Sequence, residues 1–94
     1  ITTDEPGVYI SGKHGIRLEN ELLCLEKERT DYGTFLCFEP LTLAPIDLDA
    51  LDPSLISDFE RQILNSYHKK VYETLSPYLT SEEKQWLAGY TRKI

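Results

Sequence analysis

Residues 4–20, DEPGVYISGKHGIRLEN, carry two glutamates, Glu5 and Glu19, on either side of a turn-rich loop expected at 6–15. A hairpin through that segment would bring both side chains to one place on neighbouring strands. Two carboxylates held together repel each other unless a proton or a metal ion lies between them. The pattern alone leaves two interpretations open, a carboxylate pair that binds metal and two solvated glutamates at a strand edge.

Three strands are predicted in the first half of the chain. Residues 1–5 begin with β-branched side chains, and apolar and charged residues alternate at the start of 16–26 with the period of two that a strand requires. The third strand covers 34–39, and Pro40 ends it, while a charged loop is expected at 26–33. The simplest arrangement is an antiparallel three-stranded meander.

A long amphipathic helix is predicted over 58–75. Apolar residues recur every four positions from Phe59 to Leu75, which is the spacing of one helix face. Ser57 and Glu60 match the capping box, in which a serine and a glutamate three residues later satisfy the first backbone N–H groups of a helix. Together with the strands, this helix indicates an α+β fold.

A second, shorter helix is predicted to begin after Thr80. Thr80 and Glu83 form another capping-box pattern, and Trp86 lies among the apolar residues that follow. Arg92 and Lys93 are expected in the last turn of this helix, where positive charge suits the helix dipole.

Composition excludes several classes of partner. The 94-residue chain has a net charge of −6 and a pI of about 4.8, so it lacks the basic patch that nucleic acid or an anionic membrane surface requires. No apolar run approaches the roughly eighteen residues of a membrane span, and the first residues do not resemble a signal peptide. The chain contains no Met, which leads us to expect a fragment or a processed piece.

Two cysteines, Cys24 and Cys37, are too few for a disulfide framework. Both lie in apolar runs, where free cysteine behaves as a small buried hydrophobe. We therefore expect reduced thiols in the core, which is the usual pattern inside cells. A hairpin that turns near 28–33 would place the thiols almost opposite each other, so an adventitious disulfide also stays open.

Three phrases of the sequence resemble the C-terminal end of aminopeptidase P, an Xaa-Pro aminopeptidase of the pita-bread metallopeptidase superfamily. They are Asp-Glu-Pro-Gly-x-Tyr at 4–9, Gly-Ile-Arg-Leu-Glu-Asn at 15–20 and Phe-Glu-Pro-Leu-Thr-Leu-x-Pro-Ile at 38–46. They occur in the family's order and at about its spacing. The resemblance continues more loosely through the helical tail, where Leu-Asn-x-Tyr-His at 64–68 is the best phrase.

This resemblance implies two parts. Residues 1–46 correspond to the C-terminal end of a catalytic domain, with a three-stranded antiparallel piece of its pita-bread sheet, and residues 47–94 to a helical C-terminal extension. The implied activity is hydrolysis of the N-terminal Xaa-Pro bond of peptides that have proline second. The implied location is the cytoplasm, and the implied partners are the upstream remainder of the catalytic domain and a second copy in a homodimer.

The resemblance also implies a metal site. In the family, the positions that match Glu5 and Glu19 are ligands of a dinuclear centre, most often of manganese, and carboxylates suit such hard divalent cations. Three further ligands, two Asp and one His, lie upstream in the family and have no counterpart in this chain. The chain alone is therefore expected to bind divalent metal weakly and to hydrolyse nothing.

Two residues receive a catalytic role from the resemblance. Glu5 is implied to act as a proton shuttle, while the two metal ions lower the pKa of a bridging water and polarise the scissile carbonyl. Arg17 shares a strand face with Glu19 and is implied to hold an upstream Asp ligand by charge-assisted hydrogen bonds. The alternative from the residues alone is that Arg17 is an ordinary surface arginine.

Other polar residues receive no catalytic role. His14 and His68 match no ligand of the family; His14 is expected in a loop, and His68 is expected to pack or to face solvent beside the apolar stripe. Tyr9 is expected to pack, and Glu39 to have a structural role.

Two further function classes stay open. One is a non-catalytic module that dimerises or docks and leaves its glutamates idle. The other is a different pita-bread enzyme, such as a prolidase-like dipeptidase, although Phe-Glu-Pro-Leu-Thr at 38–42 together with the helical tail favours aminopeptidase P. Metal uptake by the complete protein would separate an enzyme from an idle module.

Overall fold

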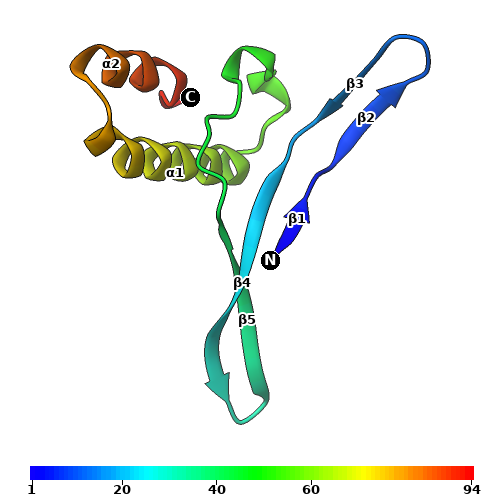
Figure 1. Cartoon of the computed structure of the whole chain (residues 1–94). Helices are drawn as coiled ribbons and strands as arrows, with labels where there is room; N and C mark the ends of the chain where they lie inside the picture. Colours follow the sequence, from blue (N-terminus) through cyan, green and yellow to red (C-terminus); the bar gives the residue numbers. More distant parts are fainter. The chain divides into compact units, whose positions relative to one another are not determined.

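Strands fill the first part of the chain and helices the second in the computed structural model, which describes residues 1–94 (Figure 1). The chain divides into two units, residues 1–42 and residues 43–94. The first unit holds a three-stranded and a two-stranded antiparallel sheet, and the second holds two α-helices with short 3₁₀ turns. The predicted α+β fold class is confirmed.

The strands of the first unit form two ladders. The three-stranded sheet has the order β1-β4-β5, and β2 pairs with β3 in a separate ribbon. The strands expected at 1–5 and 34–39 correspond to β1 and β5, and the strand expected at 16–26 covers the end of β3 and the first part of β4. The antiparallel three-stranded arrangement is confirmed. The strands are Thr2–Asp4 (β1), Gly7–Ile10 (β2), His14–Arg17 (β3), Asn20–Thr30 (β4) and Gly33–Pro40 (β5).

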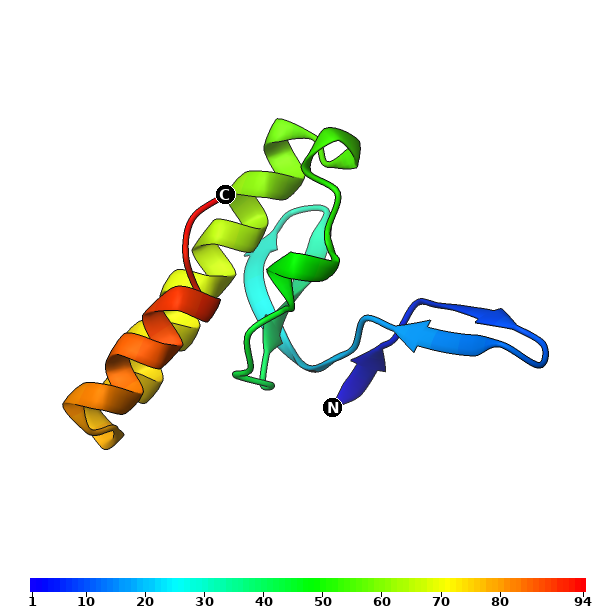
Figure 2. The same cartoon turned by 90° about the horizontal axis from the view of Figure 1, so that it is seen from above.

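The prediction of a loop at 6–15 is wrong, because most of this segment belongs to the β2–β3 ribbon. β2 and β3 pair over four residues each. Gly12 turns the chain between them with a φ of +70°, which glycine adopts without a steric penalty. Figure 2 shows this ribbon extending beyond the ends of β1 and β4. The turn residues concealed the alternation of side chains in two such short strands.

The charged loop expected at 26–33 is also wrong. β4 continues to Thr30, and β5 begins at Gly33 after a two-residue turn. The Glu26 carboxylate accepts a hydrogen bond from Arg29 Nε at 2.7 Å within β4 itself. Charged side chains are compatible with this strand because its second half is exposed on both faces.

The cysteines differ from expectation in burial and in their position in the strand register. Cys24 is exposed and Cys37 is half-buried, because no side chain of the first unit is buried in this chain. Cys24 pairs with Phe38, whereas Cys37 pairs with Leu25. Facing residues share one side of a sheet and successive residues alternate, so the two thiols point to opposite sides. Both cysteines are free, and this register does not permit a disulfide between them.

The helices of the second unit begin at the predicted capping boxes. Ser57 Oγ accepts from the Glu60 N–H at 3.1 Å, and the Glu60 carboxylate accepts from the Ser57 N–H at 2.9 Å. Thr80 and Glu83 form the same reciprocal pair. No helix has both the length and the apolar character needed to cross a bilayer. The elements are Leu48–Ala50 (η1), Pro53–Leu55 (η2), Asp58–Leu75 (α1), Ser76–Tyr78 (η3) and Ser81–Tyr90 (α2).

The core of the chain lies in this second unit. It contains three buried apolar side chains, from Leu48 in η1, Val71 in α1 and Leu87 in α2, together with His68. The three elements therefore meet around one small apolar centre. A core of this size leaves little margin, so each of its members matters for the stability of the unit.

The buried face of α1 is rotated from the predicted stripe. Phe59 and Ile63, at the start of that stripe, are exposed, whereas His68 and Val71 are the two most buried side chains of the helix. His68 was expected beside the apolar stripe, but it lies at the centre of the face that is buried. Helical spacing defined an apolar face, but it could not show that the segment before η1 contacts α1 at His68, where the Ile46 N–H donates to the ring.

His68 is buried with one nitrogen bonded. Its Nε2 accepts a hydrogen bond from the Ile46 N–H at 2.9 Å, while Nδ1 is buried without a partner. Because Nε2 accepts, the ring is neutral and carries its proton on Nδ1. Burial lowers the pKa of His68 below its ordinary value of 6.5, and the positive charge of Arg92 lowers the pKa further.

Acidification is expected to destabilise the second unit through His68. The unfolded chain takes up the proton near pH 6.5, and the folded chain takes it up only at lower pH, so the contribution of His68 is complete above pH 6.5 and is lost as the pH falls through the folded pKa. Thermal unfolding of α1, followed by circular dichroism between pH 7.5 and 5, measures the effect. H68Q keeps an acceptor for Ile46 but does not titrate, and an equally steep pH dependence in this variant would contradict the assignment.

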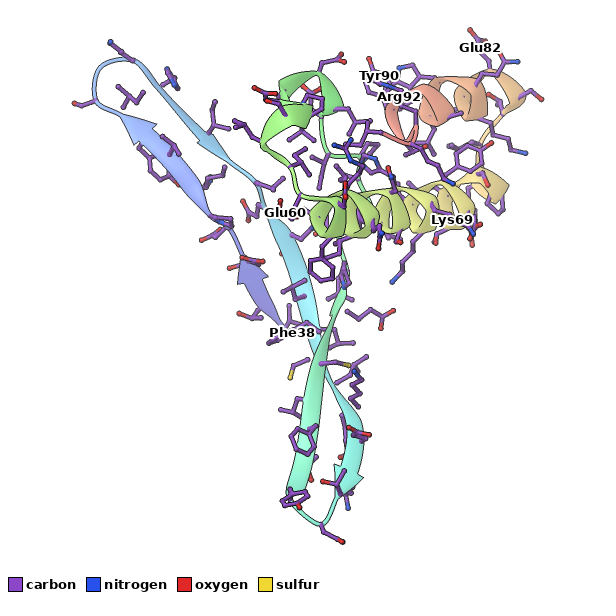
Figure 3. The ribbon with its side chains drawn as sticks, turned by 180° about the vertical axis from the view of Figure 1, so that it is seen from behind. Phe38, Glu60, Lys69, Glu82, Tyr90 and Arg92 are labelled. Atoms are coloured by element: carbon purple, nitrogen blue, oxygen red, sulfur yellow. The ribbon has the colours of Figure 1, made fainter.

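The predicted position of Arg92 and Lys93 at the end of the chain is wrong. Arg92 and Lys93 lie beyond α2, which ends at Tyr90, and not in its last turn. Arg92 still satisfies the end of the helix, because its Nη1 donates to the Gly89 carbonyl at 2.9 Å, and its Nη2 donates to Asp49 Oδ1 at 3.1 Å. Figure 3 shows Arg92 beside Tyr90 at this end of α2.

Candidate metal centre

Glu5 and Glu19 lie at the junction between the two ladders of the first unit. Glu5 follows β1, and Glu19 precedes β4. The β1–β4 ladder ends with Asp4 opposite Asn20, and the β2–β3 ladder begins with Gly7 opposite Arg17. Two residues remain on each strand between these pairs, so the register continues without a gained or lost residue and places Glu5 opposite Glu19.

A backbone hydrogen bond supports this continuity. The Leu18 N–H donates to the Pro6 carbonyl at 3.0 Å, within the gap between the two ladders. Residues that face each other across antiparallel strands share one side of the sheet, with Cβ atoms roughly 4.5–5.5 Å apart. The two carboxylates thus start from neighbouring positions on the same side.

Arg17 lies beside this pair. Its Nε is 3.9 Å from Glu19 Oε2, and both side chains are about half exposed, at 54% and 41%. An ion pair with this exposure adds little to stability, because solvent screens it. Its consequence is local, since the guanidinium offsets the negative charge that two adjacent glutamates create.

Glycines make room around Arg17. A Cβ on Gly7 would lie 2.8 Å from Arg17 Cγ and 2.8 Å from the Tyr9 hydroxyl oxygen, and a Cβ on Gly15 would lie 2.8 Å from Tyr9 Cδ1. The Tyr9 ring therefore rests against Gly15, with its hydroxyl directed back to the position opposite Arg17. The absence of side chains at both glycines lets Tyr9 and Arg17 lie flat on the ribbon.

An open depression of about 550 Å³ adjoins Glu19. Its lining consists of Glu19, Glu21, Leu41 and Thr42. Thr42 Oγ1 accepts a hydrogen bond from the Glu21 N–H at 2.9 Å, and the Leu41 N–H donates to the Glu21 carbonyl at 2.7 Å. This brings the end of β5 against the start of β4, next to Glu19.

Sequence reasoning missed Glu21 and Thr42. The period-two alternation that grouped Arg17 with Glu19 also extends to Glu21, and this was the available signal. No comparable signal existed for Thr42, because it contacts Glu21, 21 positions earlier in the sequence, only when β5 pairs with β4.

The other polar residues considered from the sequence do not lie at the junction of Glu5 and Glu19. His14 faces Ile10 at the far end of the β2–β3 ribbon, and His68 belongs to the core of the other unit. Glu39 pairs with Leu23 inside the β4–β5 ladder. No three side chains of His, Cys, Asp or Glu in this chain are placed to hold a metal ion together.

The donor set at the junction suits a hard divalent cation. Glu5 and Glu19 offer carboxylate oxygens, both residues are exposed, and neither is buried beneath other side chains of the first unit. Carboxylate oxygen is the ligand type that manganese and magnesium prefer. The pair fits one side of a divalent metal site and leaves its other positions open.

Comparisons with known families and proteins agree on one relationship. The family model described as the C-terminal region of peptidase M24 matches residues 34–94. An uncharacterized peptidase of Schizosaccharomyces pombe is 42% identical over 97 residues, and a protein of Arthroderma otae named "Probable Xaa-Pro aminopeptidase P" is 41% identical over 99 residues. Each alignment covers 100% of this chain and 16% of the relative.

A solved structure of an aminopeptidase is similar to this chain in its fold as well as in its sequence. It is described as the X-prolyl aminopeptidase from Caenorhabditis elegans, a cytosolic enzyme with a di-nuclear active site. The TM-score is 0.85 at 36% sequence identity, over 98% of this chain and 16% of that one. This chain thus spans about one sixth of the length of the proteins that it matches.

Proposed function

Because the chain belongs to the family described as the C-terminal region of peptidase M24, we propose that it is the C-terminal part of a longer, metal-dependent Xaa-Pro aminopeptidase. The substrate is a peptide with proline in second place, and the bond cut is the N-terminal Xaa-Pro bond. The observation that supports this proposal is that two residues on each strand separate the Asp4–Asn20 pair from the Gly7–Arg17 pair, a spacing in which Glu5 faces Glu19. In this assignment residues 1–46 complete the catalytic domain, and residues 47–94 form a helical extension.

Glu5 and Glu19 are the metal ligands that this chain supplies. Two divalent metal ions, manganese in our proposal, provide an activated water and a polarised scissile carbonyl when bound. The di-nuclear active site named for the C. elegans enzyme supports the number of ions. Two carboxylates on one side of a sheet suit such a centre, and the remaining ligands, two Asp and one His, come from the upstream part of the protein.

Two side chains of this chain assist the reaction in the proposed mechanism. The Glu5 carboxylate accepts a proton from the attacking water and delivers it to the nitrogen of the leaving proline. Arg17 keeps Glu19 in place through its ion pair at 3.9 Å and holds one of the upstream aspartates by charge-assisted hydrogen bonds. Alone, this chain lacks most of the ligands and is inactive.

The exposed apolar side chains support a role as part of a larger assembly. The strands leave Val8, Ile16, Leu36 and Phe38 more than half exposed, and exposed apolar surface of this kind is typical of an interaction site. We assign this surface to the upstream remainder of the catalytic domain. The exposed Trp86 on α2 supports a further contact, and we propose a homodimer in the cytoplasm.

Two alternatives are less well supported. A prolidase-like dipeptidase would share the carboxylate pair, but the name of the A. otae relative is "Probable Xaa-Pro aminopeptidase P". A docking module with idle glutamates would not require Glu5 and Glu19 to face each other.

Metal binding and peptide cleavage by the complete protein test the proposal together. We expect two manganese ions for each chain and release of the first residue from a peptide with proline second. A matched peptide with alanine second serves as the control and is expected to be a poor substrate. Cleavage of dipeptides alone would indicate the prolidase-like enzyme, and an absence of metal uptake would indicate the idle module.

A further inference from the structure

The ladder between β4 and β5 ends beside the proposed metal ligand Glu19. The last strand pair is Leu22 with Pro40. One residue further, the Leu41 N–H still donates to the Glu21 carbonyl at 2.7 Å. The Glu21 N–H donates to Thr42 Oγ1 at 2.9 Å, so the side chain of Thr42 also holds this end of β4.

The start of β4 is therefore held from both edges. On one edge β1 pairs Thr3 with Glu21 and Asp4 with Asn20. On the other edge Thr42 Oγ1 accepts from the Glu21 N–H. Glu19 itself lies outside both regular ladders, two residues before Glu21, so its position depends on how firmly this end of β4 is fixed.

From this geometry we propose that Thr42 is a positioning residue for the metal ligand Glu19. The hydroxyl fixes the peptide of Glu21, and Glu19, Glu21 and Thr42 line one depression. Partners that orient metal ligands typically change metal affinity or activity by about 10–100-fold when they are removed. The inference rests on the proposed function, because it takes Glu19 as a ligand.

T42V tests the inference, since valine keeps the shape of threonine and removes the acceptor. In the complete protein we expect T42V to weaken manganese affinity about tenfold, measured by competition with a chelator. T42S keeps the hydroxyl and is expected to bind manganese as the wild type does. In the metal-free protein, T42V is expected to speed hydrogen exchange at the Glu21 amide, which reports the lost bond directly.

Thr30 offers a matched control in the same hairpin. Its Oγ1 accepts from the Tyr32 N–H at 3.2 Å at the other end of β4. T30V removes an equivalent hydrogen bond far from Glu19 and is expected to leave manganese affinity unchanged. Wild-type affinity in T42V, or an equal loss in T42V and T30V, would overturn the positioning role.

E19Q separates this inference from the proposed function. If E19Q weakens manganese binding and T42V does not, Glu19 is a ligand and only the role of Thr42 is wrong. If E19Q binds manganese as the wild type does, the proposed metal site fails, and the role of Thr42 fails with it.

Discussion

Replacement of Glu5 by glutamine in the complete protein is expected to lower kcat by about 10²–10⁴-fold, the range typical of a lost general acid–base group. Glutamine has nearly the same shape but cannot take up and release the proton, and it is a poorer ligand for a hard cation. Glu5 is exposed and outside the core, so the fold should survive. The measurement is the hydrolysis rate of a peptide with proline second, at saturating manganese.

E28Q is the matched control for this experiment. Glu28 is an exposed glutamate on β4 that pairs with Phe35, far along the strand from the junction. The same chemical change there is expected to leave kcat within a factor of two or so, as surface substitutions usually cost little. Equal kcat in E5Q and the wild type would remove Glu5 from the mechanism.

Replacement of Leu87 by alanine is expected to have the largest effect on stability, about 2–5 kcal/mol of unfolding free energy. Leu87 is only 3% exposed and is the one residue of α2 in the small core of the second unit. Truncation removes apolar contact and leaves a cavity that so few neighbours cannot fill. Urea unfolding of the helices, followed by circular dichroism, measures the change.

Leu55 provides the same substitution without burial. It is 81% exposed in η2, and L55A is expected to change the unfolding free energy by no more than about 0.5 kcal/mol. A loss in L87A no larger than that in L55A would show that α2 does not depend on this core.

The helices were the most predictable part of the chain. Ser57 and Thr80 start α1 and α2 where the capping boxes predicted, because a cap is satisfied by side chains within three residues of each other. The strands were less predictable. The β2–β3 ribbon and the second half of β4 were expected as loops, since strand pairing depends on partners that local composition does not identify.

The residues of the candidate site also differ in how well the sequence predicts them. Glu5, Arg17 and Glu19 could be chosen from the phrases around them, and the register then placed them at one junction. Their roles as ligands and as the proton shuttle remain predictions, for which E5Q and E19Q are the tests. Thr42 could not be chosen, because its hydrogen bond joins residues 21 positions apart and arises only when β5 lies beside β4.

Short-range signals were enough to establish the helix starts and the family of this chain, because they depend on side chains within a few residues or on phrases preserved in order. The fold in three dimensions was needed to learn which face of α1 is buried, that the thiols of Cys24 and Cys37 point apart, and that His68 lies in the core. These features depend on contacts between distant segments. The spacing and composition of one segment do not show which other segment will pack against it.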